Sequence, residues 1–90
     1  MNEQMSRNVV IVNELGMHAR SAAKIAQLAQ QAVADVWLEK DGEQVDATSV
    51  IDLLSLICPQ GTAVTIAISD GRDINILDEL VDLIEKGFGE

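Results

Sequence analysis

The dipeptide Asp41-Gly42 separates two short segments with strand-like alternation, "ADVWLEK" and "EQVDA". A type I′ turn needs two residues that tolerate positive φ, and Asp-Gly is one of the pairs that supply them. The pattern therefore predicts a β-hairpin over residues 35–47. This hairpin constrains the whole fold, because a chain of 90 residues is long enough for one small core only. Every other element must pack on the sheet that the hairpin begins.

The remaining sequence alternates between strand-like and helix-like segments. Apolar and β-branched runs predict further strands at residues 8–12 and 62–69. Apolar residues at spacings of three and four predict helices from Ala19 onward, within residues 48–59 and within residues 73–88. The predicted order is β-α-β-β-α-β-α.

Local signals mark the ends of two predicted helices. Thr48 and Ser49 are N-cap candidates for the second helix, and Pro59 prevents its continuation. Gly87 is expected to stop the third helix. We predict a single α+β domain over residues 1–90, in which three helices bury their apolar stripes on one face of a four-stranded, at least partly antiparallel sheet.

Composition excludes several functions. The net charge of −9 would repel a phosphate backbone, so we expect no nucleic-acid partner. No apolar stretch approaches the roughly 18–20 residues of a membrane span, and "MNEQMSRN" does not resemble a secretory signal, so we expect a cytoplasmic protein without membrane insertion. One cysteine and one histidine provide no disulfide and no zinc cluster, and we expect neither metal nor cofactor. The acidic residues of the last third, including Asp73, are expected on a solvated helix face.

The only histidine, His18, lies between the turn signal "NELG" and the first predicted helix. Gly16 suits a tight turn, and the first N–H groups of a helix have no acceptor within it. The N–H groups of Ala19 and Arg20 could hold a phosphate there, with the Arg20 guanidinium as a further donor. The neutral His18 ring could then act as a nucleophile toward a phosphoryl group.

A purely structural explanation of these residues is also open. A single histidine at a helix start is often only a tolerated cap, and an arginine two residues later is usually solvated. Spacing alone favours this explanation, so the local pattern suggests phosphate chemistry without establishing it.

The segment "GMHARSAAKIAQLA" resembles the active-site segment of HPr, the family of histidine-containing phosphocarrier proteins of the bacterial phosphotransferase system. The family pattern is Gly-Leu-His-Ala/Thr-Arg-Pro-Ala, matched here by Gly16, His18, Arg20 and Ala22, with Met17 for leucine. A second segment, "ATSVIDLLSLICPQGTAVTI", is similar to the family's Ala-Lys-Ser, apolar helix and glycine before the last strand. The resemblance runs from about Val9 to Ile84. It implies an open-faced β-sandwich with a four-stranded antiparallel sheet and three helices on one face.

The resemblance also implies a function. His18 would accept a phosphoryl group from phospho-enzyme I, itself charged by phosphoenolpyruvate, and pass it to a IIA component, with Arg20 stabilising the phosphate. In the family the phosphate is on Nδ1. Such a protein is a stoichiometric carrier with a phosphohistidine intermediate, not an enzyme, and we expect a monomer. The implied partner surface comprises Met17, Lys24, Val50, Ile51 and Leu54.

Ser49 falls on the family's regulatory serine, which HPr kinase/phosphorylase modifies in some relatives. The alternative function is therefore an HPr-like regulator that acts mainly through Ser49. A structural reason for the residue exists as well, because serine is a preferred N-cap, typically worth about 1 kcal/mol.

The chain departs from the family pattern at several positions. Ser21 replaces the usual proline, from which we expect retained activity with a modest loss of rigidity. Where several relatives carry lysines, this chain has Gln27, Gln30 and Asp52, so we expect a partner matched to it. A third class, the acyl carrier proteins, is also small and acidic with a serine before an apolar helix. That fold is all helical, which the predicted strands oppose.

Overall fold

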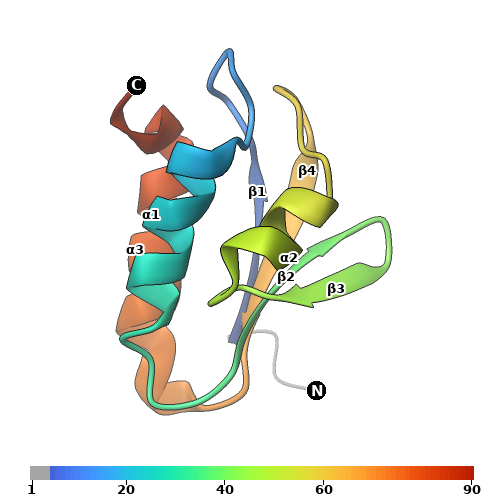
Figure 1. Ribbon diagram of the computed structural model, residues 1–90. Helices are drawn as coiled ribbons and strands as arrows, with labels where there is room; N and C mark the ends of the chain where they lie inside the picture. Colours follow the sequence, from blue (N-terminus) through green and yellow to red (C-terminus); the bar gives the residue numbers. More distant parts are fainter. Residues whose placement is uncertain (1–4) are drawn as a thin grey trace.

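The computed structural model describes residues 5–90 and contains the predicted order of elements (Figure 1). The elements are β1 (Ser6–Val10), α1 (Ala19–Ala29), β2 (Val36–Lys40), β3 (Glu43–Asp46), α2 (Val50–Ser55), β4 (Ala63–Ile68) and α3 (Ile74–Glu85). Two 3-10 turns flank α3, η2 (Gly71–Asp73) before it and η3 (Gly87–Gly89) after it. None of the helices in this part of the chain is long and apolar enough to cross a bilayer.

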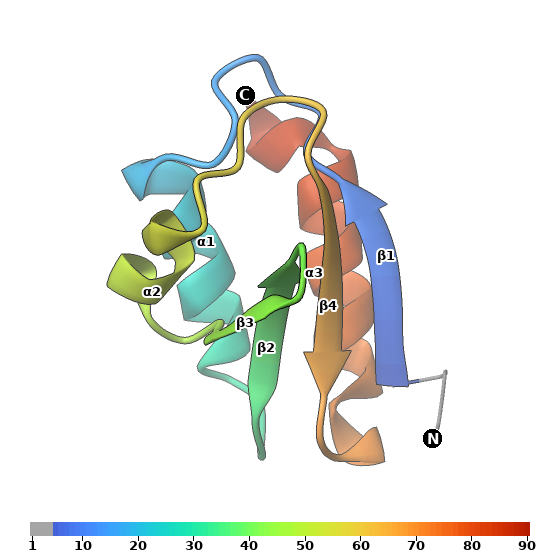
Figure 2. The same cartoon turned by 90° about the vertical axis from the view of Figure 1, so that its right-hand side faces the viewer.

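The four strands form one sheet in the order β1-β4-β2-β3, and all three neighbouring pairs are antiparallel (Figure 2). The predicted hairpin is confirmed, since β2 pairs with β3 across Asp41 and Gly42. Both turn residues have positive φ, 52° and 84°, as a type I′ turn requires. The fully antiparallel sheet that the family resemblance implied is therefore present.

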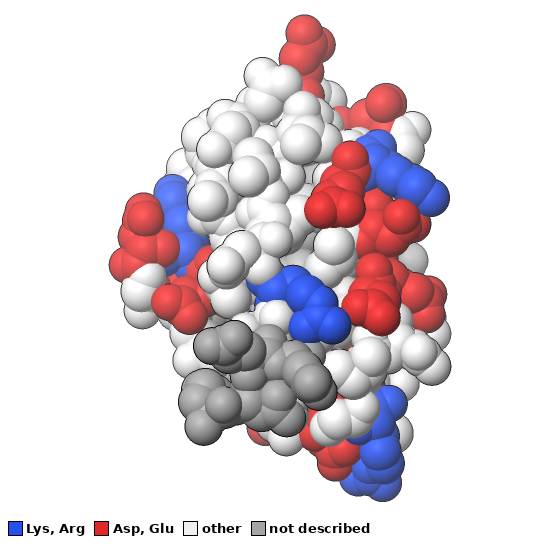
Figure 3. Space-filling model, turned by 180° about the vertical axis from the view of Figure 1, so that it is seen from behind, with Lys and Arg blue, Asp and Glu red and all other residues white. Residues whose placement is uncertain are grey.

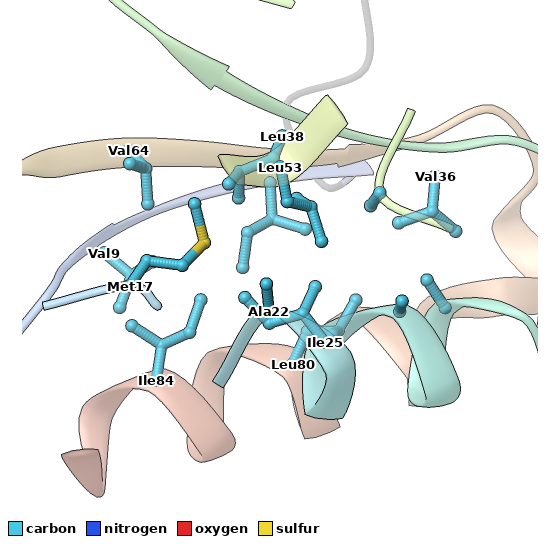
Figure 4. Packing of buried hydrophobic residues seen from close by; sticks show 14 of the residues in the cluster. Val9, Met17, Ala22, Ile25, Val36, Leu38, Leu53, Val64, Leu80 and Ile84 are labelled. Carbon is cyan, nitrogen blue, oxygen red and sulfur yellow. The ribbon is translucent and has the colours of Figure 1, made fainter. Parts of the chain in front are cut away.

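Helices α1 and α3 lie side by side on one face of the sheet, with α3 on β1 and β4, while α2 contacts α1 and β3 (Figure 1). The core fills the space between the sheet and these helices (Figure 4). The predicted apolar stripes point into it, with Ile25 from α1 and Leu80 from α3 completely buried. Their burial is the main source of stability for such a short chain.

Several boundaries differ from the prediction. Strand β1 begins at Ser6 rather than Asn8, and it ends at Val10 rather than Val12, because the chain continues with irregular hydrogen bonds between Ile11 and the residues before β4. Helix α2 ends at Ser55, and Ile57 has a φ of +55°. This left-handed conformation is unusual for a β-branched residue.

Acidic side chains cover the solvent side of α3, as the sequence predicted. Figure 3 shows them gathered on the side where α3 lies, beside a broad uncharged area. The exposed acids of this helix are Asp78, Glu79, Asp82 and Glu85. The prediction is wrong for Asp73, which is buried because its carboxylate accepts the backbone N–H groups of Val33 and Ala34.

Candidate functional site

His18 is the N-cap of α1, with an extended backbone (φ −128°, ψ −176°). The turn before it depends on Gly16, which has a φ of +68°. A Cβ at this position would lie 2.6 Å from the carbonyl oxygen of Cys58, so only glycine fits. The next residue, Met17, donates its N–H to the same Cys58 oxygen at 2.8 Å. The turn that presents His18 is thus fixed to the segment that follows α2.

The two ring nitrogens of His18 have different partners. Nδ1 accepts the backbone N–H of Arg20 at 3.3 Å, and Nε2 lies 2.6 Å from Oε2 of Glu90. A backbone N–H only donates and a carboxylate only accepts, so the partners assign the proton of the neutral ring to Nε2. Nδ1 then carries the lone pair and points to the N-terminus of α1. The spacing of residues in the sequence left this choice open.

Glu90 is a residue of the site that the sequence analysis did not identify. Its Oε1 accepts from Nδ2 of Asn13 at 2.9 Å while its Oε2 contacts His18. The hydrogen bond from Asn13, and after it the one from His18, lowers the pKa of the Glu90 carboxyl below its usual value. Asn13, Glu90 and His18 therefore form one hydrogen-bonded chain.

The C-terminal segment is held against the site by two further contacts. The Phe88 side chain is buried in the core, and Lys24 donates from Nζ to the Phe88 carbonyl oxygen at 2.6 Å. Figure 1 shows the C-terminus beside the first turn of α1. One feature of the sequence could have indicated this packing. Phe88 is a large aromatic residue directly after the predicted helix stop at Gly87, and such a side chain is expected to be buried.

Arg20 is exposed at the start of α1. Among residues 5–90, its guanidinium has no hydrogen bond or ion pair with another group, while its backbone N–H is bonded to His18. The side chain can therefore turn toward an anion at Nδ1 without breaking an existing contact.

Ser21 caps the first turn of α1 through hydrogen bonds to the backbone of His18. It is completely buried, and its Oγ accepts the backbone N–H of His18 at 2.9 Å and donates to the His18 carbonyl oxygen at 3.1 Å. Such a reciprocal cap fixes the first turn of a helix. The hydroxyl thus holds the backbone of His18, and the modest loss of rigidity relative to proline stays a prediction.

Two members of the predicted partner surface do not lie free at the surface. Met17 is only 9% exposed and packs in the hydrophobic core (Figure 4). The ammonium of Lys24 is bonded to Phe88, so it anchors the C-terminal segment. The sequence did not show that these two side chains are occupied, because their partners lie in distant parts of the chain.

The other predicted surface residues lie on α2, where Ile51 is exposed and Val50 and Leu54 are half-buried. Ile51, Leu15 and Ile57 are the three most exposed large aliphatic residues that the structure describes, at 80%, 72% and 70%. Leu15 lies in the loop before His18. Ile57 directly precedes Cys58, the residue that binds this loop.

Ser49 is the N-cap of α2, as predicted, and its Oγ accepts the N–H of Asp52 at 3.2 Å. Before it, the N–H and hydroxyl of Thr48 both donate to the Asp46 carboxylate. The Ser49 hydroxyl therefore has a structural role as a helix cap, and a negative charge is locally tolerated at a helix N-terminus.

Known proteins resemble this chain along nearly its whole length. The family model described as "PTS HPr component phosphorylation site" matches residues 5–86. The chain is 37% identical over 86 residues to the phosphocarrier protein HPr of Cupriavidus necator, covering 96% of this chain and 97% of the relative. It is 36% identical over 87 residues to the phosphocarrier protein NPr of Escherichia coli K12, with the same coverage of 96% and 97%.

The fold is also similar to solved structures. A crystal structure of HPr-C-His from Thermoanaerobacter tengcongensis superposes with a TM-score of 0.88 at 36% sequence identity. The match covers 94% of this chain and 96% of the other.

Proposed function

The chain belongs to the HPr family of phosphocarrier proteins of the phosphotransferase system, and on this basis we propose that Nδ1 of His18 accepts a phosphoryl group from phospho-enzyme I. The group then passes to a IIA protein, and both transfers take place in the cytoplasm. The observation that carries the proposal is the pair of ring contacts: Nδ1 accepts the Arg20 N–H at the N-terminus of α1, while Nε2 lies against the Glu90 carboxylate. The protein is a stoichiometric carrier in this scheme and acts as a monomer.

The surroundings of Nδ1 suit a transferable phosphoryl group. The Nδ1 lone pair attacks phosphorus, the bond from phosphorus to the donor breaks, and its electron pair leaves with the donor. As the new bond forms, the N–H of Arg20 loses its acceptor at Nδ1 and becomes available to a phosphate oxygen. The N–H of Ala19, the positive end of the helix dipole and the Arg20 guanidinium add further stabilisation. These contacts stabilise the bound phosphoryl group only moderately, so it can still be transferred to the next protein.

The partners dock, in this proposal, on an apolar surface formed by Leu15, Ile51 and Ile57 with Val50 and Leu54. These side chains lie on the loop before His18, on α2 and on the segment after α2, and the first three are the most exposed large aliphatics of the described chain. The surface lacks the positive charge that lysines would add, because this chain has Gln27, Gln30 and Asp52 at those positions. We therefore expect an enzyme I with an apolar complement and an affinity that depends weakly on salt.

The experiment that tests the proposal is incubation with phosphoenolpyruvate and enzyme I from the same source, followed by measurement of acid-labile phosphate. We expect the wild type to be labelled and His18→Ala to remain unlabelled. Arg20→Ala should slow labelling and leave the unfolding midpoint unchanged. Arg72→Ala is the control for labelling only, because Arg72 is exposed in η2 at the opposite end of the molecule (Figure 1) and pairs there with Asp70. An unlabelled wild type, or equal labelling of His18→Ala, contradicts the carrier function.

The regulatory alternative requires HPr kinase/phosphorylase to modify Ser49. The N-cap role of Ser49 accounts for this residue without phosphorylation. Phosphoserine is stable in acid, so acid-stable label that disappears in Ser49→Ala would restore this alternative.

A further inference from the structure

We propose that Glu90 is a positioning residue for phosphoryl transfer, which keeps the ring proton of His18 on Nε2 throughout the cycle. This inference rests on the proposed function, in which Nδ1 is the nucleophile. The contact that carries it is the 2.6 Å distance between Glu90 Oε2 and His18 Nε2. The C-terminal segment thereby becomes part of the phosphorylation site.

The carboxylate is fixed from its other side. Asn13 donates from Nδ2 to Glu90 Oε1 at 2.9 Å and to the Gly16 carbonyl oxygen at 2.8 Å. Its own Oδ1 is buried without a hydrogen-bond partner among the described residues. Leaving a buried acceptor unpaired is unfavourable, so the two acceptors of Nδ2 must determine the orientation of this amide. Rotating it would place its oxygen against two acceptor oxygens.

The C-terminal segment is also held independently of this hydrogen-bonded chain. Phe88 is buried in the core, and Lys24 Nζ binds the Phe88 carbonyl oxygen. The position of residue 90 beside the ring therefore does not depend on the Glu90 carboxylate. A substitution of this side chain should change the chemistry of the ring and leave the segment in place.

The proposed role follows from the balance of protons in each transfer. On acceptance, the bond between Nδ1 and phosphorus forms while the proton stays on Nε2, so the ring becomes positively charged beside the carboxylate. On donation, that bond breaks, its electron pair returns to Nδ1, and the ring leaves as neutral imidazole. No proton has to move in either direction. With the proton on Nδ1 instead, the nucleophilic lone pair would be missing.

Glu90→Gln provides a direct test, because glutamine has the same size. Its oxygen can still accept from Asn13, and its amide nitrogen then donates to Nε2 of His18. We expect 15N spectra of the neutral ring to show the proton on Nε2 in the wild type and a shift toward Nδ1 in the variant. Single-turnover acceptance should fall roughly tenfold, because only rings with the lone pair on Nδ1 can react. Glu79→Gln, an exposed acid of α3, is the control and should change neither quantity.

The two measurements separate this proposal from the function on which it rests. The ring tautomer is measured on unphosphorylated protein without enzyme I. An unlabelled wild type would thus refute the carrier function while the spectrum still reports on Glu90. An unchanged tautomer in Glu90→Gln overturns the positioning role, even if transfer slows, because the loss would then arise from docking.

Discussion

The hydroxyl of Ser21 and the backbone of His18 form a closed pair, in which Ser21 Oγ accepts the His18 N–H at 2.9 Å and donates to the His18 carbonyl at 3.1 Å. Most of the hydrogen-bonding capacity of this buried hydroxyl is thereby used on the backbone of His18. A serine at the family's proline position thus fixes the first turn of α1 by another route, through hydrogen bonds instead of a restrained φ.

Ser21→Ala should therefore reduce both stability and transfer. The His18 N–H would lose its acceptor, which lowers the free energy of unfolding by about 1–2 kcal/mol. Urea unfolding measures this loss, and transfer from enzyme I should slow because the backbone of His18 is less restrained. Ser55→Ala is the matched control, since Ser55 is exposed at the end of α2. Equal stability of the two variants would show that the cap contributes nothing.

Ile57→Gly should stabilise the fold and weaken docking. Ile57 has a φ of +55°, and its carbonyl accepts from Lys40 Nζ at 2.6 Å, which holds this end of α2 in place. A non-glycine residue in this conformation costs about 1–2 kcal/mol, part of which glycine recovers. We expect a higher urea midpoint together with a higher KM for enzyme I, because the 70% exposed side chain is lost from the docking surface.

Ile57→Ala separates these two effects. Alanine retains the unfavourable backbone conformation but removes most of the side chain, so KM should rise without a gain in stability. A glycine variant that is less stable than wild type would contradict the assignment of strain. An unchanged KM in both variants would show that the Ile57 side chain does not contact enzyme I.

Local patterns were sufficient to predict most of the fold. The turn at Asp41-Gly42 needs only two residues that accept positive φ, and the stripes of α1 and α3 need only helical spacing. For the same reason His18 was placed correctly at the start of α1. The presentation of a helix N-terminus is a property of a few consecutive residues.

The rest of the site depends on contacts between distant segments. Glu90 lies 72 residues from His18, and no pattern near either residue indicates their contact. The burial of Met17 and the bond from Lys24 to Phe88 likewise follow from how the C-terminal segment packs on α1. Sequence reasoning therefore identified His18 and missed Glu90, whose carboxylate lies against its ring.

Asp73→Ala should destabilise the protein by about 2 kcal/mol, because two backbone N–H groups would lose a charged acceptor. The Asp73 carboxylate accepts from Val33 at 2.8 Å and from Ala34 at 3.0 Å, which joins the loop after α1 to the start of α3. Urea unfolding measures the change. Asp82→Ala is the control, since this acid is exposed on α3 and pairs only with Lys86 in the described chain. A loss no larger than that of the control would show that water replaces the carboxylate.

Asp70→Asn should change how stability depends on acid pH. The Arg72 side chain donates hydrogen bonds to the Asp70 carboxylate, and the Arg72 backbone N–H donates another. Together they lower the pKa of Asp70 from 3.8 to about 2. The unfolded chain therefore binds a proton at higher pH than the folded one, so this contribution is complete above pH 3.8 and is lost as the pH falls toward 2. The difference in unfolding free energy between wild type and Asp70→Asn should be largest above pH 3.8 and should vanish near about pH 2. Urea unfolding across the window measures it, and Arg72→Ala should give the same profile. A difference that is constant with pH would mean that the ion pair does not shift this carboxyl.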